Sequence, residues 1–118
     1  MNALLKGLIV SILLLALDTP WLLWNSENFD TVIRKIQGSA LRFRPEAILI
    51  VYPALAFLLL RAKTVADAFL LGAATYSVYD FTNYASLTNY PLSFAITDTL
   101  WGGTLFALGR TALDFLKI

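Results

Sequence analysis

The sequence of 118 residues contains no cysteine and no histidine, and only 14% of its residues are charged. Without cysteine the chain has no disulfide, no thiol nucleophile and no thiolate ligand for a metal. Without histidine it lacks the most frequent general base and the most frequent transition-metal ligand. These absences remove the main hydrolase and zinc-enzyme classes, so we expect no enzymatic activity and no cofactor.

An excess of charge of one sign is also missing. Nine basic and eight acidic residues give a net charge of +1, and the basic residues form no long run. A nucleic-acid-binding surface needs a basic patch, which this balance does not supply. We therefore expect no nucleic-acid partner.

Apolar side chains, in contrast, are abundant and make up 58% of the residues. Ordinary soluble domains carry about 25% charged residues, and a domain of this size leaves a large part of its surface exposed. A chain this apolar is therefore expected to fold in a lipid bilayer, as a single membrane domain over residues 1–118.

The hydrophobic pattern predicts an all-α integral membrane protein with four transmembrane helices. The first apolar segment is long enough to cross the ~30 Å hydrocarbon core at ~1.5 Å per residue. A cleaved signal peptide is the alternative, because Lys6 precedes the apolar run, but Trp21 to Trp24 continue it without a small-residue cleavage site. Thr64 with Asp67, and Pro91, are typical of helix starts. The predicted spans are 3–24, 45–61, 65–86 and 91–110, the second being the shortest and interpreted as a peripheral or shorter companion.

The connection between the first two spans is amphipathic. Phe29, Val32, Ile33 and Ile36 recur at helical spacing, which predicts a short interfacial helix that stops at Gly38. An ordinary polar loop helix is the alternative. Protein partners, or a second copy of the chain, are expected to bind this helix or the faces of the spans. The residues expected to make interfacial contacts are Phe29, Ile33, Arg34, Lys35, Arg42 and Arg44.

Three carboxylates lie within the predicted spans, each roughly 10 Å below the surface that carries the amphipathic segment. A lipid-facing carboxylate costs roughly 2.5 to 3.5 kcal/mol on insertion scales, so these side chains are expected to turn inward and meet. Aromatic and amide side chains one turn away share their helix faces, whereas Trp24 and Tyr90 near span ends are interpreted as interface anchors. The predicted intramembrane polar cluster contains Asp18, Trp21, Tyr76, Asp80, Asn83, Asp98 and Trp101.

Intramembrane aspartyl proteases share part of this pattern, with Asp80 and Asp98 on successive helices and a Pro-Ala-Leu element at Pro53. Those enzymes have a Gly-x-Gly before the second aspartate, where this chain has Ala95 to Thr97. In those enzymes the Pro-Ala-Leu element follows the two acids, whereas in this chain it precedes them. Four spans are also too few for that fold. The motif match is too short to support a protease.

Three segments resemble a family of small predicted membrane proteins that is known as a domain of unknown function, with bacterial members and relatives in large DNA viruses. They are Leu17 to Leu22, Tyr76 to Ala85 and Asp98 to Gly102. The resemblance extends over nearly the whole chain, although Phe81 replaces a usual leucine and the second span matches only loosely through Tyr52. It implies an architecture and no activity. Its viral members imply, for this chain, a place in an internal virion membrane beneath a protein shell.

Two functions are compatible with these features. The first is a non-enzymatic structural or scaffolding protein of a cellular or virion membrane, in which the polar cluster locks the helices together. The alternative is a small oligomeric transporter or channel for ions, protons or small molecules, because intramembrane acids often mark such pathways. In both cases the chain is a multi-pass membrane protein.

Overall fold

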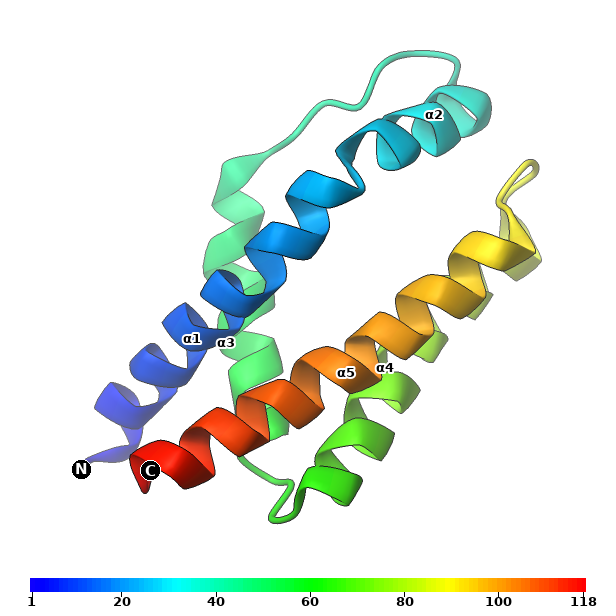
Figure 1. Ribbon diagram of the computed structural model, residues 1–118. Helices are drawn as coiled ribbons and strands as arrows, with labels where there is room; N and C mark the ends of the chain where they lie inside the picture. The colour runs from blue at the N-terminus through cyan, green and yellow to red at the C-terminus, as the bar shows by residue number, and fades with distance from the viewer.

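The computed structural model describes residues 1–118 and is entirely helical, with no β-strand (Figure 1). This confirms the all-α fold class. The elements in chain order are α1 (Ala3–Trp24), α2 (Ser26–Gln37), the short 3-10 helix η1 (Pro45–Ala47), α3 (Ile48–Leu59), α4 (Val65–Ser86) and α5 (Leu92–Leu116).

Local signals in the sequence account for several helix ends. The side chain of Asn2 accepts a hydrogen bond from the Leu5 amide at 2.8 Å, and the hydroxyl of Thr64 accepts one from the Asp67 amide at 3.1 Å. Both satisfy amide groups that have no partner within the first turn. Gly38 ends α2 at φ 78°, a left-handed conformation that glycine adopts without strain. The helix stop expected at Gly38 is thereby confirmed.

The predicted ranges 3–24 and 65–86 coincide with α1 and α4. The predicted range 45–61 corresponds to η1 followed by α3, and α5 continues well beyond the expected end at residue 110. Arg110 is buried rather than at the membrane surface: its guanidinium pairs with Asp114 at 3.0 Å and donates to the carbonyl oxygen of Ala62 at 3.2 Å. Because the Arg110 guanidinium has these partners, α5 can continue past it to Leu116.

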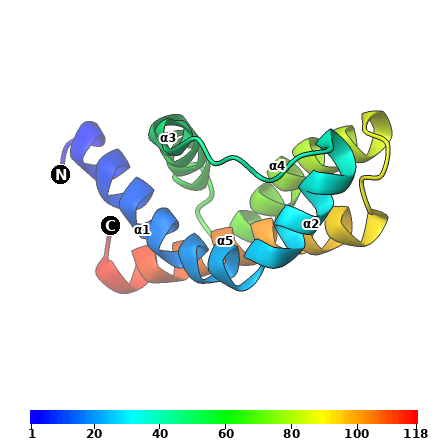
Figure 2. The ribbon, with the colours of Figure 1, turned by 90° about the horizontal axis from the view of Figure 1, so that it is seen from above.

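The helices form two antiparallel pairs, α1 with α3 and α4 with α5 (Figure 1). Both chain termini lie at one end of the molecule, and α2 and the α4–α5 turn lie at the other. Seen from above, α2 extends over the α4–α5 pair (Figure 2). There the ring of Phe29 packs edge-on against Phe94 with 5.3 Å between centroids, and the Asn89 side-chain amide donates to the Lys35 carbonyl oxygen at 3.2 Å.

The apolar core joins α1, α3 and α5 near the end that carries the termini. Leu14, Leu59 and Phe106 are fully buried there, and the hydrogen of Gly109 leaves room for the leucine side chains of α1 and α3. Of the two alternatives for the second span, a peripheral or a shorter companion, the structure agrees with the shorter one, since α3 has 12 residues but contributes to the core. In α3 the buried residues are Tyr52, Leu55, Ala56 and Leu59.

Many large apolar side chains point outward. Leu4 and Phe115 are 85% exposed, and Leu49 and Val78 at least 70%. By length and composition one helix, α1, qualifies as a membrane span, and the apolar helix Pro45–Leu59 is shorter. In α4 and α5 the acidic residues and Arg110 reduce the apolar character of the sequence, although most of those polar side chains point into the bundle.

Candidate functional site

The first part of the candidate site centres on Asp18, which α1 holds in a buried position. The Tyr52 hydroxyl on α3 donates to one oxygen of its carboxylate at 2.5 Å. The Trp101 indole N–H on α5 donates to the other oxygen at 2.8 Å. One carboxylate therefore accepts hydrogen bonds from two other helices. We call Asp18, Tyr52 and Trp101 the Asp18 site.

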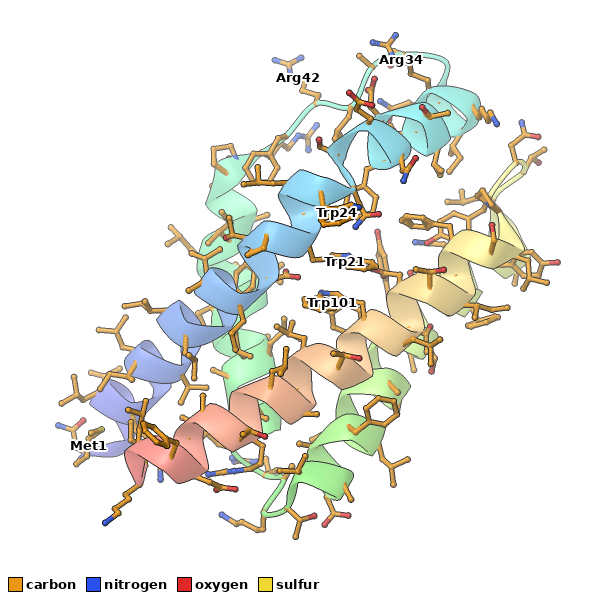
Figure 3. All side chains as sticks on the ribbon, in the orientation of Figure 1. Met1, Trp21, Trp24, Arg34, Arg42 and Trp101 are labelled. Carbon is orange, nitrogen blue, oxygen red and sulfur yellow. The ribbon has the colours of Figure 1, made fainter.

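Trp21 adds a stacking contact to this site. It lies one turn beyond Asp18 on α1, and its ring is parallel to that of Trp101, with 4.8 Å between centroids and 6° between planes. Figure 3 shows the two indoles between α1 and α5, with Trp24 beyond them. The indole N–H of Trp21 is buried and has no hydrogen-bond acceptor. The two tryptophans thus differ, since Trp101 supplies a hydrogen bond and Trp21 supplies stacking alone.

The second part centres on Asp80 of α4, which is fully buried. The Tyr90 hydroxyl, from the α4–α5 turn, donates to its carboxylate at 3.0 Å, and the Thr99 hydroxyl on α5 donates at 3.4 Å. The carboxyl group of Asp98, one position before Thr99 on α5, is a close neighbour of Asp80. Burial, together with the negative charge of Asp80, raises the pKa of Tyr90 above its ordinary value, so its phenol stays a donor. We call Asp80, Tyr90, Asp98 and Thr99 the Asp80 site.

Tyr76 lies between the two sites. Its ring covers Gly102 of α5, where an added Cβ would overlap the ring atoms. Asp80 follows Tyr76 by one turn on α4, and Trp101 of the Asp18 site is the residue before Gly102. Asn83 lies one turn beyond Asp80 on α4 and near Tyr90. The structure therefore arranges the acids of the predicted cluster as two neighbouring sites.

Three residues of these sites were not predicted: Tyr52, Tyr90 and Thr99. Tyr90 was interpreted as an interface anchor, but it is buried with its hydroxyl on Asp80. Trp24, interpreted in the same way, is 87% exposed. Tyr52 is the one side chain with a hydrogen-bonding group in α3, and that isolation was a signal that the sequence offered. No group of three acidic side chains is arranged to hold a metal ion.

The residues expected to make interfacial contacts lie along α2 and the loop after it. Phe29 and Ile33 are half-buried on the side of α2 that faces the bundle. Arg34 and Arg42 point away from the bundle (Figure 3). Lys35 and Arg44 are exposed. This surface is therefore basic outward and apolar inward.

Comparison with protein families agrees with this architecture. The family model described as "Predicted membrane protein (DUF2177)" matches residues 3–113, from the start of α1 into the last turn of α5. The chain belongs to this family. No curated protein and no solved structure matches it. The expected resemblance to a membrane-protein family of unknown function is thereby confirmed, and the DUF2177 chain is an all-α predicted membrane protein.

Proposed function

We propose that this DUF2177 protein is a multi-pass membrane scaffold without enzymatic activity, in which α1, η1 with α3, α4 and α5 are the four crossings. The observation that carries the proposal is the Asp18 carboxylate, which accepts hydrogen bonds from Tyr52 on α3 and Trp101 on α5. A buried acid with donors from two other helices supports a role in holding the helices together.

Helix dimensions support the four crossings. At ~1.5 Å per residue, the 22 residues of α4 and the 25 of α5 measure ~33 and ~38 Å against a ~30 Å hydrocarbon core. Outward-facing Leu70, Val78 and Leu100 suit contact with lipid. η1 and α3 together are shorter, at roughly 24 Å, and the long side chains of Arg44 and Arg61 at their ends can reach the headgroups.

The absence of native cysteine allows a direct test of the crossings. Single cysteines at Ser39, Lys63, Thr88 and Lys117 are labelled with a membrane-impermeant maleimide, from outside and after permeabilisation. Four crossings place Ser39 and Thr88 on one side of the membrane, and Lys63 and Lys117 on the other. Labelling of Lys63 from the same side as Ser39 contradicts a crossing by α3.

The hydrogen bonds of the two sites support the structural role over transport. Asp18 and Asp80 both accept donors from more than one segment of the chain, so neither needs a ligand to satisfy its carboxylate. A scaffold requires that Asp80→Asn lowers the stability of the purified protein and leaves liposomes with the same ion and proton leak as before. Flux through the wild-type protein that Asp80→Asn abolishes contradicts the scaffold.

The transport alternative has one observation in its favour. Asp98 lies beside Asp80 within the bundle, and paired intramembrane acids occur in proton and cation pathways. Such a small bundle encloses little volume, so this function requires an oligomer. The same flux measurement decides between the two proposals.

Partners of the scaffold are proposed to bind the basic surface formed by α2 and its following loop. Arg34, Lys35, Arg42 and Arg44 are exposed there, which suits acidic protein segments or anionic headgroups at the membrane surface. A place in an internal virion membrane stays a prediction from the family resemblance. Crosslinking from Arg42→Cys in native membranes identifies the neighbouring chain.

A further inference from the structure

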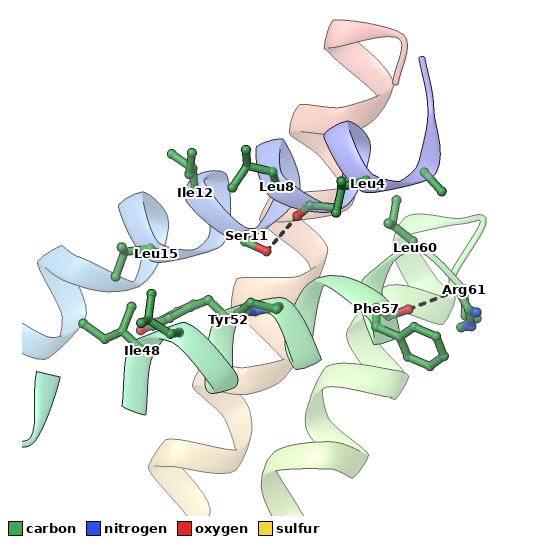
Figure 4. A pocket seen from close by; sticks show the side chains of 14 residues that line it. Leu4, Leu8, Ser11, Ile12, Leu15, Ile48, Tyr52, Phe57, Leu60 and Arg61 are labelled. Atoms are coloured by element: carbon green, nitrogen blue, oxygen red, sulfur yellow. Dashed lines mark hydrogen bonds between the residues drawn. The ribbon is translucent and has the colours of Figure 1, made fainter. Parts of the chain in front are cut away.

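An apolar groove of about 640 Å³ runs between α1 and α3 on the outside of the bundle (Figure 4). We call it the α1–α3 groove. Leu8, Ile12 and Leu15 of α1 form one wall, and Tyr52 and Phe57 of α3 with Leu60 just after it form the other. Arg61 lies at the end of the groove that also carries Leu4 and Leu60 (Figure 4).

The polar groups in the walls of the groove are already satisfied. The Ser11 hydroxyl donates to the Gly7 carbonyl oxygen of its own helix at 2.7 Å. The Tyr52 hydroxyl is occupied by Asp18. Along its length the groove therefore offers only apolar contacts, which suits an occupant that is itself apolar along its length.

At the Arg61 end the groove offers a positive charge. The guanidinium lies over the Phe57 ring at 3.7 Å from the centroid and donates one hydrogen bond to the Phe57 carbonyl oxygen at 3.4 Å. Arg61 is in neither of the two ion pairs of the structure, which are Arg34–Asp30 and Arg110–Asp114. Its remaining N–H donors are available to an anion. The charges thus call for an occupant that is anionic at one end.

The dimensions select among such occupants. From Leu4 to Leu15 the α1 wall measures roughly 16 Å, which is about half of the ~30 Å hydrocarbon core. The groove is therefore about as long as one leaflet is thick.

We propose that the α1–α3 groove binds one acyl chain of an anionic phospholipid, with the headgroup phosphate at Arg61. This inference rests on the proposed membrane crossings, which place Arg61 at headgroup depth. The lipid fills the gap between α1 and α3, and its phosphate accepts hydrogen bonds from the guanidinium. Lys63, two residues further along the chain, adds positive charge at the same end.

The test titrates the full chain in mild detergent with phosphatidylglycerol or with phosphatidylcholine of the same acyl chains, and counts bound lipid by native mass spectrometry. We expect one tightly bound phosphatidylglycerol per chain and weaker binding of phosphatidylcholine. Arg61→Gln should lower the affinity for phosphatidylglycerol about fivefold, to the level of the affinity for phosphatidylcholine. Lys117→Gln removes an exposed charge that does not line the groove and should change neither value.

A second variant blocks the groove itself. An added Cβ at Gly7 meets nothing within 4 Å, so the Gly7→Leu side chain can enter the groove without disturbing the helices. We expect Gly7→Leu to weaken the binding of both lipids, whereas Gly7→Ala should leave the binding of both unchanged. The proposal is overturned if the wild-type chain binds both lipids equally, or if both Arg61→Gln and Gly7→Leu bind phosphatidylglycerol as the wild type does. A change of oligomeric state in Gly7→Leu without a change in bound lipid assigns the groove to a second copy instead.

Because lipid binding is measured in detergent, its outcome is separate from the cysteine labelling that tests the crossings. Loss of the lipid preference with labelling as expected overturns the lipid site alone. Labelling of Lys63 from the wrong side overturns the four crossings, and with them the headgroup depth of Arg61.

Discussion

The two helix pairs of this molecule pack in different ways. Between α4 and α5, Gly72, Gly102 and Gly103 leave no space for a side chain, because backbone or aromatic atoms of the facing helix lie directly on them. Between α1 and α3, an added Cβ at Gly7 meets nothing within 4 Å, and the α1–α3 groove lies between the helices. Small residues permit close backbone approach in membranes, where lipid provides no hydrophobic force between helices. One pair is therefore closed by its own contacts, and the other is open to an occupant.

The largest effect is expected from Gly72→Ala in the closed pair. Its methyl group would overlap the backbone oxygen of Gly102 and the Cβ of Phe106, neither of which can move without separating the helices. We expect the free energy of unfolding to fall by about 2 to 3 kcal/mol. Thermal and denaturant unfolding in detergent micelles measure it.

Gly7→Ala is the matched control, since nothing lies near the added methyl group. In the open pair we expect a change within about 0.5 kcal/mol, and alanine favours the helix. Equal destabilisation by Gly72→Ala and Gly7→Ala would show that close contact at the glycines does not determine the packing of α4 against α5.

A smaller effect is expected inside the open pair, where Asp18 of α1 meets Tyr52 of α3. Tyr52→Phe removes one of the two hydrogen bonds to Asp18, and we expect a loss of about 1 to 1.5 kcal/mol. A double-mutant cycle with Asp18→Asn measures their coupling. Tyr79→Phe is the control, because Tyr79 is 65% exposed and makes no side-chain hydrogen bond in the structure. A coupling near zero would remove this hydrogen bond as a link between α1 and α3.

Sequence alone predicted the features that depend on the free energy of single side chains in lipid or on neighbouring residues in the chain. Burial of a carboxylate in lipid is expensive wherever it occurs, so Asp18, Asp80 and Asp98 were expected to turn inward together. Start and stop signals at Thr64 and Gly38 depend on neighbouring residues, and they agree with the structure.

The remaining features depend on distances between segments far apart in the chain. Asp18 and Tyr52 are 34 positions apart and meet only after α1 and α3 have packed. The extension of α5 past Arg110 requires the Ala62 carbonyl oxygen, which comes from the α3–α4 turn. No sequence period or motif predicts the division of the acids into two sites, and none predicts the α1–α3 groove.

The stacked tryptophans allow a sharper test at the same junction. Trp101→Phe leaves an oxygen of Asp18 without its donor, and we expect a loss of about 1 kcal/mol. Trp21→Phe keeps most of the stacking area and removes a buried N–H that has no acceptor, so its effect should lie within about 0.5 kcal/mol of zero. Detergent unfolding of both variants measures the difference. If Trp21→Phe is the more harmful of the two, stacking contributes more at this junction than the Trp101 hydrogen bond does.

The smallest effect is expected in the segment that connects α1 to α3, which consists of α2 and the loop after it. The hydrogen bond from Arg34, and then that from the Leu41 amide, lower the pKa of Asp30 below its usual 3.8. A carboxylate with a lowered pKa in the folded state stabilises the fold above its unfolded pKa, and that contribution is lost as pH falls through the folded value. We therefore expect protection of the Leu41 amide from hydrogen exchange, corrected for intrinsic rates, to be constant from neutral pH to about 4 and to fall below it. Asp30→Asn should remove that protection at neutral pH, while Glu27→Gln and the amides of α4 and α5 stay unchanged. Full protection of Leu41 in Asp30→Asn would mean that packing of Phe29 and Phe94, rather than this carboxylate, holds the connection in place.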